Sequence, residues 1–128
     1  MPTSTPLYAG FLALLFVFLS YRVVQARRLK KVSVGDGGES LVLKAMRAQA
    51  NCAEYAPIGI ILLLLAELQG MPVWMVHVLG LMLLTGRLLH AYGFGGTPQV
   101  VPARVWGMYL TLAAIVLPAL ANIGLALF

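Results

Sequence analysis

The sequence predicts an all-α integral membrane protein, built as a bundle of four transmembrane helices in a single domain over residues 1–128. Hydrophobic residues make up 61% of the 128 residues and charged residues only 10%. Average soluble domains are closer to half apolar and a quarter charged. The mean hydropathy of +0.92 agrees with this excess. The length corresponds to one domain, and four long apolar segments divide it.

The first predicted span covers residues 7–24, near the length of about 20 residues that crosses a bilayer core. No basic residue precedes it, and its apolar stretch is longer than a signal-peptide core, so we expect a retained span. Residues 25–40 then form a basic loop with three glycines near its middle. That loop lacks the GxxxxGK[ST] pattern of a phosphate-binding loop.

The second span covers residues 40–69 and is too long to lie wholly in the membrane. At 1.5 Å per residue its helix is roughly 44 Å long, against a hydrocarbon core of about 30 Å. Its first half is polar, whereas residues 58–66 are continuously apolar. We therefore expect the polar half to lie at or beyond one membrane surface.

The last two spans cover residues 73–92 and 102–128, and they follow a tight turn at residues 70–72. A loop at residues 93–101 separates them and contains three glycines and a proline. Pro102 suits the first turn of the fourth helix. Pro118 is a candidate site for a kink in that helix.

The distribution of charge predicts the topology. The net charge is +5, and all nine lysines and arginines fall around the two longer loops and the adjoining span ends. The positive-inside rule places these loops in the cytoplasm, so both termini should be periplasmic. The basic residues thus have a topological explanation, and we expect no nucleic-acid partner. The short loops favour a bacterial inner membrane over an organelle membrane.

A stripe of polar residues on the second span is the richest candidate site. Arg47, Asn51 and Glu54 fall within an arc of roughly 60° at about 100° per residue, and Lys44 extends the stripe. Such a stripe could bind a zwitterionic ligand, with Glu54 taking an ammonium group and Arg47 a carboxylate. The alternative is an interhelical clamp in which Glu54 pairs with an arginine.

Arg87, His90 and Arg104 should converge with this stripe into a basic pocket at the cytoplasmic surface. Each has a structural alternative: His90 could be a hydrogen-bonding group of the core, and Arg104 a headgroup anchor. Glu67 lies toward the other surface and could reach it by snorkelling. Cys52 and the two histidines form no recognised metal-ligand spacing, so no metal site is predicted.

A basic pocket with one acid suits a thiol-containing acidic peptide. A free thiol has a pKa of about 8.5, and a neighbouring arginine stabilises the thiolate, which is the reactive form. Such a site needs little acid–base machinery because the ligand supplies the nucleophile.

Residues 47–57, R-A-Q-A-N-C-A-E-Y-A-P, resemble the signature of the MAPEG superfamily, the membrane-associated proteins in eicosanoid and glutathione metabolism. Three further groups agree with family motifs: residues 26–28 with 32–33, residues 102–104, and Arg87 with His90 and Gly93. The resemblance covers nearly the whole chain. It implies a homotrimer whose active sites lie between neighbouring subunits and open to the cytoplasm.

The resemblance also implies roles for individual residues in binding glutathione, the co-substrate of enzymatic members. One subunit would hold glutathione through Arg47, Asn51, Glu54 and Tyr55, with His90 at a position that is Tyr or His in relatives. Arg27 and Gln49 would contribute from the neighbouring subunit. Arg104 would activate the thiol as the catalytic residue. Phe94 departs from the pattern because enzymatic relatives usually carry a ligand-binding Tyr there.

We therefore expect a membrane-bound glutathione transferase that conjugates glutathione to hydrophobic electrophiles, with a possible glutathione peroxidase activity. A non-catalytic lipid-binding or scaffold protein of the same superfamily is the main alternative, and Phe94 mildly favours it. The third hypothesis is that the protein is a small four-helix multidrug transporter. It is disfavoured because such transporters carry a membrane-embedded Glu in their first helix, and this chain has none there.

Overall fold

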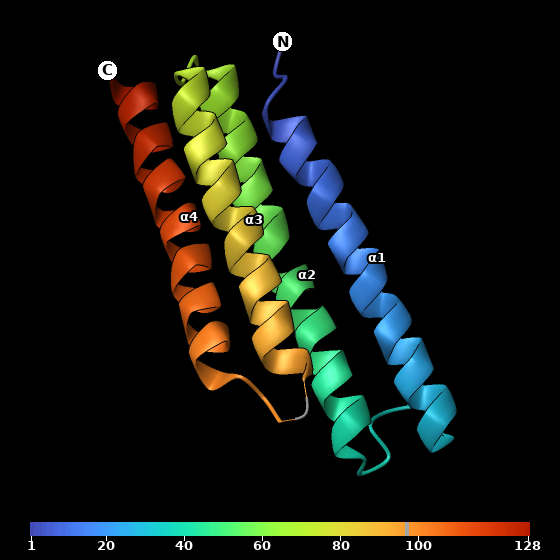
Figure 1. The fold of residues 1–128 in the computed structure, drawn as a ribbon. Coiled ribbons are helices and arrows are strands. Elements are labelled where there is room, and N and C mark those ends of the chain that lie inside the picture. Colours follow the sequence, from blue (N-terminus) through green and yellow to red (C-terminus); the bar gives the residue numbers. More distant parts are fainter. Residues whose placement is uncertain (97) are drawn as a thin grey trace.

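The protein folds as a bundle of four long helices, seen in Figure 1 in a computed structural model that describes residues 1–96 and 98–128. The helices are α1 (Thr5–Lys30), α2 (Ser40–Leu68), α3 (Val73–Gly95) and α4 (Val101–Leu127). Each is long and apolar enough to cross a membrane. Within the described ranges there is no strand. The predicted all-α, four-span architecture is confirmed.

α2 and α3 form the middle of the bundle. α1 packs against both of them, α4 packs against both from the other side, and α1 does not touch α4 within the described part of the chain. Both termini and the turn between α2 and α3 lie at one end, whereas the two longer loops lie at the other (Figure 1). This arrangement agrees with the prediction that the basic residues lie toward the end of the bundle that carries the two longer loops. Which end faces the cytoplasm stays a prediction.

Two helices extend beyond the spans that hydropathy predicts. α1 continues to Lys30, and its last turn contains Arg27, Arg28 and Lys30. Cations at a helix C-terminus interact favourably with the helix dipole, so the polar extension remains helical. α3 continues through the predicted loop start to Gly95, whose carbonyl accepts a 2.8 Å hydrogen bond from Nη2 of Arg22. Thr97, within the predicted loop at 93–101, lies outside the described residues.

Glu67, near the end of α2, caps the N-terminus of α1. Its Oε1 accepts hydrogen bonds from the backbone N–H groups of Thr3 and Ser4 at 2.9 and 2.8 Å. Its Oε2 accepts one from the N–H of Thr5 at 2.8 Å. The first N–H groups of a helix have no partner inside the helix and attract an anion. The predicted snorkelling of Glu67 is therefore replaced by a specific bond between two helices.

His77 of α3 extends this polar cluster. Its Nδ1 lies 2.8 Å from the hydroxyl of Tyr8, and its Nε2 lies 3.4 Å from the hydroxyl of Ser4. The Tyr8 and His77 rings also meet edge to face, with centroids 5.8 Å apart. Together with Glu67, His77 ties the start of α1 to α2 and α3.

α3 and α4 approach each other closely because glycines face the contact. A Cβ atom on Gly107 would collide with the backbone of His90, and one on Gly93 with the backbone nitrogen of Arg104. A Cβ on Gly86 would lie 2.9 Å from the backbone nitrogen of Thr111. Small residues at helix contacts allow backbones to pack directly in membranes. The contact places the first turn of α4 beside the last turn of α3.

We predict that Glu67→Ala destabilises the bundle by about 1–3 kcal/mol, because the first N–H groups of α1 lose a charged acceptor. The thermal unfolding midpoint in detergent measures the change. Glu39→Ala is the matched control, since that acid is exposed and pairs only loosely with Lys30 at 3.7 Å. Equal midpoints for the two variants would contradict a capping role.

Candidate functional site

A polar cavity of about 470 Å³ lies between α2, α3 and α4, toward the end of the bundle that carries the longer loops. Small-molecule sites commonly occupy about 300–1,000 Å³. The residues that line this polar cavity are Arg47, Asn51, Tyr55, His90, Phe94, Arg104, Val105, Met108 and Tyr109. Five predicted site residues thus come together: Arg47, Asn51, Tyr55, His90 and Arg104.

The α2 residues that line the polar cavity recur once in each helical turn. Arg47, Asn51 and Tyr55 are four residues apart and therefore share one face. Glu54 does not line the cavity, but it is placed at the rim by its contact with Arg47, since its Oε1 is 3.8 Å from Nη1 of that lining residue. Both side chains of this pair are about half exposed, at 51% and 53%. Arg47 and Glu54 both belong to α2, so their ion pair does not join two helices. The predicted interhelical clamp through Glu54 is therefore wrong.

The bridge between α2 and α3 is instead formed by Arg87 and Asn51. Arg87 is 1% exposed. Its Nη2 donates to Oδ1 of Asn51 at 2.6 Å, and its Nη1 donates to the backbone carbonyl of Asn51 at 3.2 Å. The guanidinium carbon also lies 5.9 Å from the centre of the Tyr55 ring. Arg87 therefore supports the cavity wall from behind and does not line the cavity.

The opposite wall is formed by the end of α3 and the start of α4. The rings of His90 and Phe94 stack with centroids 5.5 Å apart and an interplanar angle of 24°. The guanidinium carbon of Arg104 lies 4.5 Å from the centre of the Phe94 ring. Nη1 of Arg104 also donates a long hydrogen bond of 3.4 Å to Gln99. The arginine is exposed on its cavity side and so remains accessible to a ligand.

The charges of the polar cavity suit a small anionic or zwitterionic ligand. Arg47 and Arg104 provide two guanidinium groups on different helices, and such groups can bind carboxylates through paired donors. Glu54 adds one acceptor at the rim for an ammonium group. Because Oδ1 of Asn51 accepts from Arg87, its amide NH₂ group is the part that remains for a ligand.

Besides Glu54, two predicted ligands of glutathione, Arg27 and Gln49, do not line the polar cavity of their own chain. Nη1 of Arg27 donates to the carbonyl of Gly35 at 2.7 Å and so closes the loop between α1 and α2. Nε2 of Gln49 donates to the hydroxyl of Ser20 at 2.8 Å, on the side of α2 that faces α1. Their predicted contribution from a neighbouring subunit stays a prediction.

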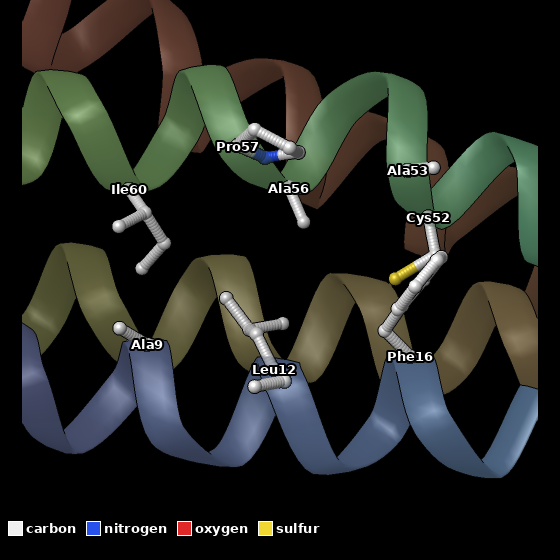
Figure 2. Close-up of a pocket in the computed structure, with 9 residues that line it drawn as sticks. Ala9, Leu12, Phe16, Cys52, Ala53, Ala56, Pro57 and Ile60 are labelled. Carbon is white, nitrogen blue, oxygen red and sulfur yellow. The ribbon is translucent and has the colours of Figure 1, made fainter.

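An apolar cavity of about 310 Å³ lies between α1 and α2. Figure 2 shows Leu12 and Phe16 of α1 facing Cys52 and Ile60 of α2 across it. Cys52 is buried. The described residues contain no cluster of three side chains that could hold a metal ion. The exposed ridge of α2, formed by Arg47, Glu54, Ile58 and Ile61, separates this apolar cavity from the polar one.

The sequence-based site omitted the α4 residues Val105, Met108 and Tyr109, which also line the polar cavity. Helical spacing could have found Met108, which lies four residues after Arg104 on the same face, whereas Val105 and Tyr109 form the neighbouring pair four residues apart. Tyr92, two residues before Phe94, is 67% exposed and lies outside the cavity lining, so it does not supply the missing hydroxyl. The role of Arg87 behind Asn51 could not be inferred from spacing within one helix.

Comparison with known proteins establishes the class of this four-helix membrane protein. The profile of the MAPEG family matches residues 5–124, so the chain belongs to the MAPEG family. It is 44% identical over 117 residues to the inner membrane protein YecN of Escherichia coli K12, covering 91% of this chain and 88% of that protein. YecN of Escherichia coli O6:H1 matches over the same shares. The chain is accordingly an integral membrane protein.

We predict that Arg87→Met lowers stability by about 1–3 kcal/mol, because the side-chain oxygen of the half-buried Asn51 loses its donor and α3 loses its two hydrogen bonds to α2. Thermal unfolding in detergent measures this loss. Arg28→Met, at an exposed position near the end of α1, is the matched control. An unchanged or higher midpoint for Arg87→Met would mean that burying the guanidinium costs as much as its hydrogen bonds return.

Proposed function

We propose that this protein is a membrane-bound glutathione transferase that conjugates glutathione to hydrophobic electrophiles. The observation that carries the proposal is the convergence of Arg47, Asn51, Tyr55, His90 and Arg104 on one cavity in a MAPEG family chain. Glutathione has two carboxylates, one ammonium group and one thiol. The polar cavity offers two guanidinium groups, an amide and a rim carboxylate, which complement these groups in charge.

Arg104 is the residue proposed to activate the thiol. A guanidinium beside the sulfur stabilises the thiolate and raises its population at neutral pH. The thiolate sulfur then forms a bond to the electrophilic carbon, and the leaving group departs with the bonding electron pair. With a lipid hydroperoxide as the acceptor, two glutathione molecules would instead yield the alcohol, water and glutathione disulfide.

A second copy of the chain is expected to complete the site. The ridge of α2 exposes the Arg47–Glu54 pair, with both side chains about half exposed. Charged side chains that face lipid within a span are costly, so a protein partner at this ridge is favourable. A closed ring of copies joins unlike surfaces of neighbours. In a homotrimer of this kind, the flank that carries Gln49 and the apolar cavity would face the neighbour's polar cavity.

Such a trimer would bring a hydrophobic substrate to the thiol. The apolar cavity between α1 and α2 is lined almost entirely by aliphatic and aromatic groups, which suit a lipid-soluble electrophile. The same packing would bring Arg27 and Gln49 toward a neighbour's glutathione. We place the protein in a bacterial inner membrane, as the name of its relative YecN states for that protein, with the polar cavity facing the cytoplasm and both termini periplasmic.

A non-catalytic lipid-binding or scaffold function is the second candidate. Phe94 favours it, because this side chain lines the polar cavity without a hydroxyl to offer glutathione. The apolar cavity would then be the main binding site. Glutathione binding separates the two candidates, since the second function does not require it.

We predict saturable glutathione binding to the detergent-purified protein by calorimetry, weakened roughly tenfold or more by Glu54→Ala because a charged contact is lost. Glu39→Ala, which removes an acid outside the cavity, should bind normally. Arg104→Ala should lower turnover with chlorodinitrobenzene on the order of 100-fold while binding glutathione within about tenfold of wild type. Absence of binding by the folded protein would favour the lipid-binding function.

We further predict that native mass spectrometry of the detergent-solubilised protein gives the mass of three chains. Replacing exposed Ile58 of the α2 ridge with Asp should shift the distribution toward single chains, because it buries an unpaired charge in the proposed interface. Val116→Asp, on the exposed face of α4, is the control for a new charge elsewhere. A purely monomeric wild-type protein that still binds glutathione would contradict a site shared between copies.

A further inference from the structure

Phe94 lies between the two groups that define the end wall of the polar cavity. Its ring stacks against the His90 ring with centroids 5.5 Å apart. The guanidinium carbon of Arg104 lies 4.5 Å from the ring centre. Phe94 is half-buried and itself lines the cavity. A side chain that offers no hydrogen bond therefore touches the residue proposed to activate the thiol.

The ring face of Phe94 restrains the Arg104 head group. A cation within about 6 Å of an aromatic centre is attracted by the negative face of the ring, more strongly where water is partly excluded. The alternative restraint, the bond to Gln99, is long at 3.4 Å. Among the residues that the structure describes, no carboxylate pairs with Arg104. The guanidinium is therefore held by the ring face while its charge remains unneutralised.

The backbone fixes this arrangement before any ligand binds. The N–H of Val100 donates to the carbonyl of Gly93 at 3.0 Å, which closes the connection between α3 and α4. Gly93 packs directly against the backbone of Arg104, where any Cβ atom would collide. Phe94 follows Gly93 immediately, so its ring is carried beside the Arg104 side chain, where it meets the guanidinium.

We propose that Phe94 is a positioning residue, whose ring face holds the Arg104 guanidinium at the polar cavity so that its full charge is available to a bound thiolate. The inference rests on the proposed function for its effect on catalysis. The contact between ring and guanidinium stands without that function. This role requires the face of an aromatic ring and does not require a hydroxyl group. Phe94 can therefore fill it although it lacks the hydroxyl of a Tyr.

Two variants separate the ring from the space that it fills. Phe94→Leu keeps an apolar side chain but removes the ring, and Phe94→Tyr keeps the ring and adds a hydroxyl. Three quantities are compared with wild type: the glutathione dissociation constant, turnover with chlorodinitrobenzene, and the pH midpoint of thiolate formation, followed by ultraviolet absorbance of bound glutathione. A fourth is the nuclear magnetic resonance shift of Arg104 Nε–H without ligand, assigned with Arg104→Lys.

Phe94→Leu should lower turnover roughly three- to thirty-fold, the range that a lost cation–π contact implies. It should raise the pH midpoint of thiolate formation while changing the glutathione dissociation constant much less. Phe94→Tyr should keep both the turnover and the pH midpoint of thiolate formation close to their wild-type values. In the unliganded protein, the upfield ring-current shift of Arg104 should be present in wild type and Phe94→Tyr and absent in Phe94→Leu.

Two results would overturn the positioning role. One is an Arg104 resonance without a ring-current shift in the folded wild-type protein. The other is a Phe94→Leu variant that binds and conjugates glutathione with the wild-type pH midpoint. If wild type shows the ring-current shift but binds no glutathione, the contact is established and the proposed function fails instead.

Discussion

The polar half of this bundle depends on the hydrogen bonds from Arg87 to Asn51. A guanidinium buried in an apolar bundle is tolerated only when it is hydrogen-bonded. Arg87 meets most of this requirement, because Nη1 and Nη2 bind the backbone carbonyl and the side chain of Asn51, while its buried Nε has no partner among the described residues. Those two bonds set the register of α3 against α2. The polar cavity lies against this junction, so its α2 wall is placed by a residue that never faces the ligand.

The geometry of α2 divides the candidate residues between two flanks. Asn51 and Tyr55 lie on the polar flank, and Gln49 lies on the other flank, bonded to α1. Helical periodicity requires this separation, because residues two apart point about 200° away from each other. One chain therefore cannot gather all the predicted glutathione ligands. A neighbouring copy resolves the separation in the proposed trimer, since a closed ring joins one flank to the other.

The contact between α3 and α4 determines the rest of the cavity. Gly93 and Gly107 remove the side chains that would keep the two backbones apart. Arg104 can then lie beside the end of α3, where the Phe94 ring meets its guanidinium at 4.5 Å. At the far end of the bundle, Glu67 supplies an anion to the start of α1 and keeps that helix against α2 and α3. Glu67 and its backbone partners thus hold the end of the bundle that carries the two termini.

The number of helices, their approximate ends and the residues of the α2 stripe could all be predicted from the sequence. Hydropathy and helical periodicity depend only on neighbouring residues, so they can be read without a structure. The positions of His90 and Arg104 at the same predicted surface placed them with this stripe, and the cavity contains both. The helical extensions of α1 and α3 were missed because basic side chains and distant partners, not hydropathy, stabilise them.

Which polar groups bind each other depends on the tertiary structure. Arg87, placed near the ligand from sequence, is buried behind Asn51, and Glu67 caps a helix that begins more than 60 residues earlier in the chain. The contact between Arg104 and Phe94 likewise joins separate helices. Such partners are chosen by the packing of helices and by the need to satisfy buried polar groups. Neither depends on spacing along the chain, and so neither could be read from it.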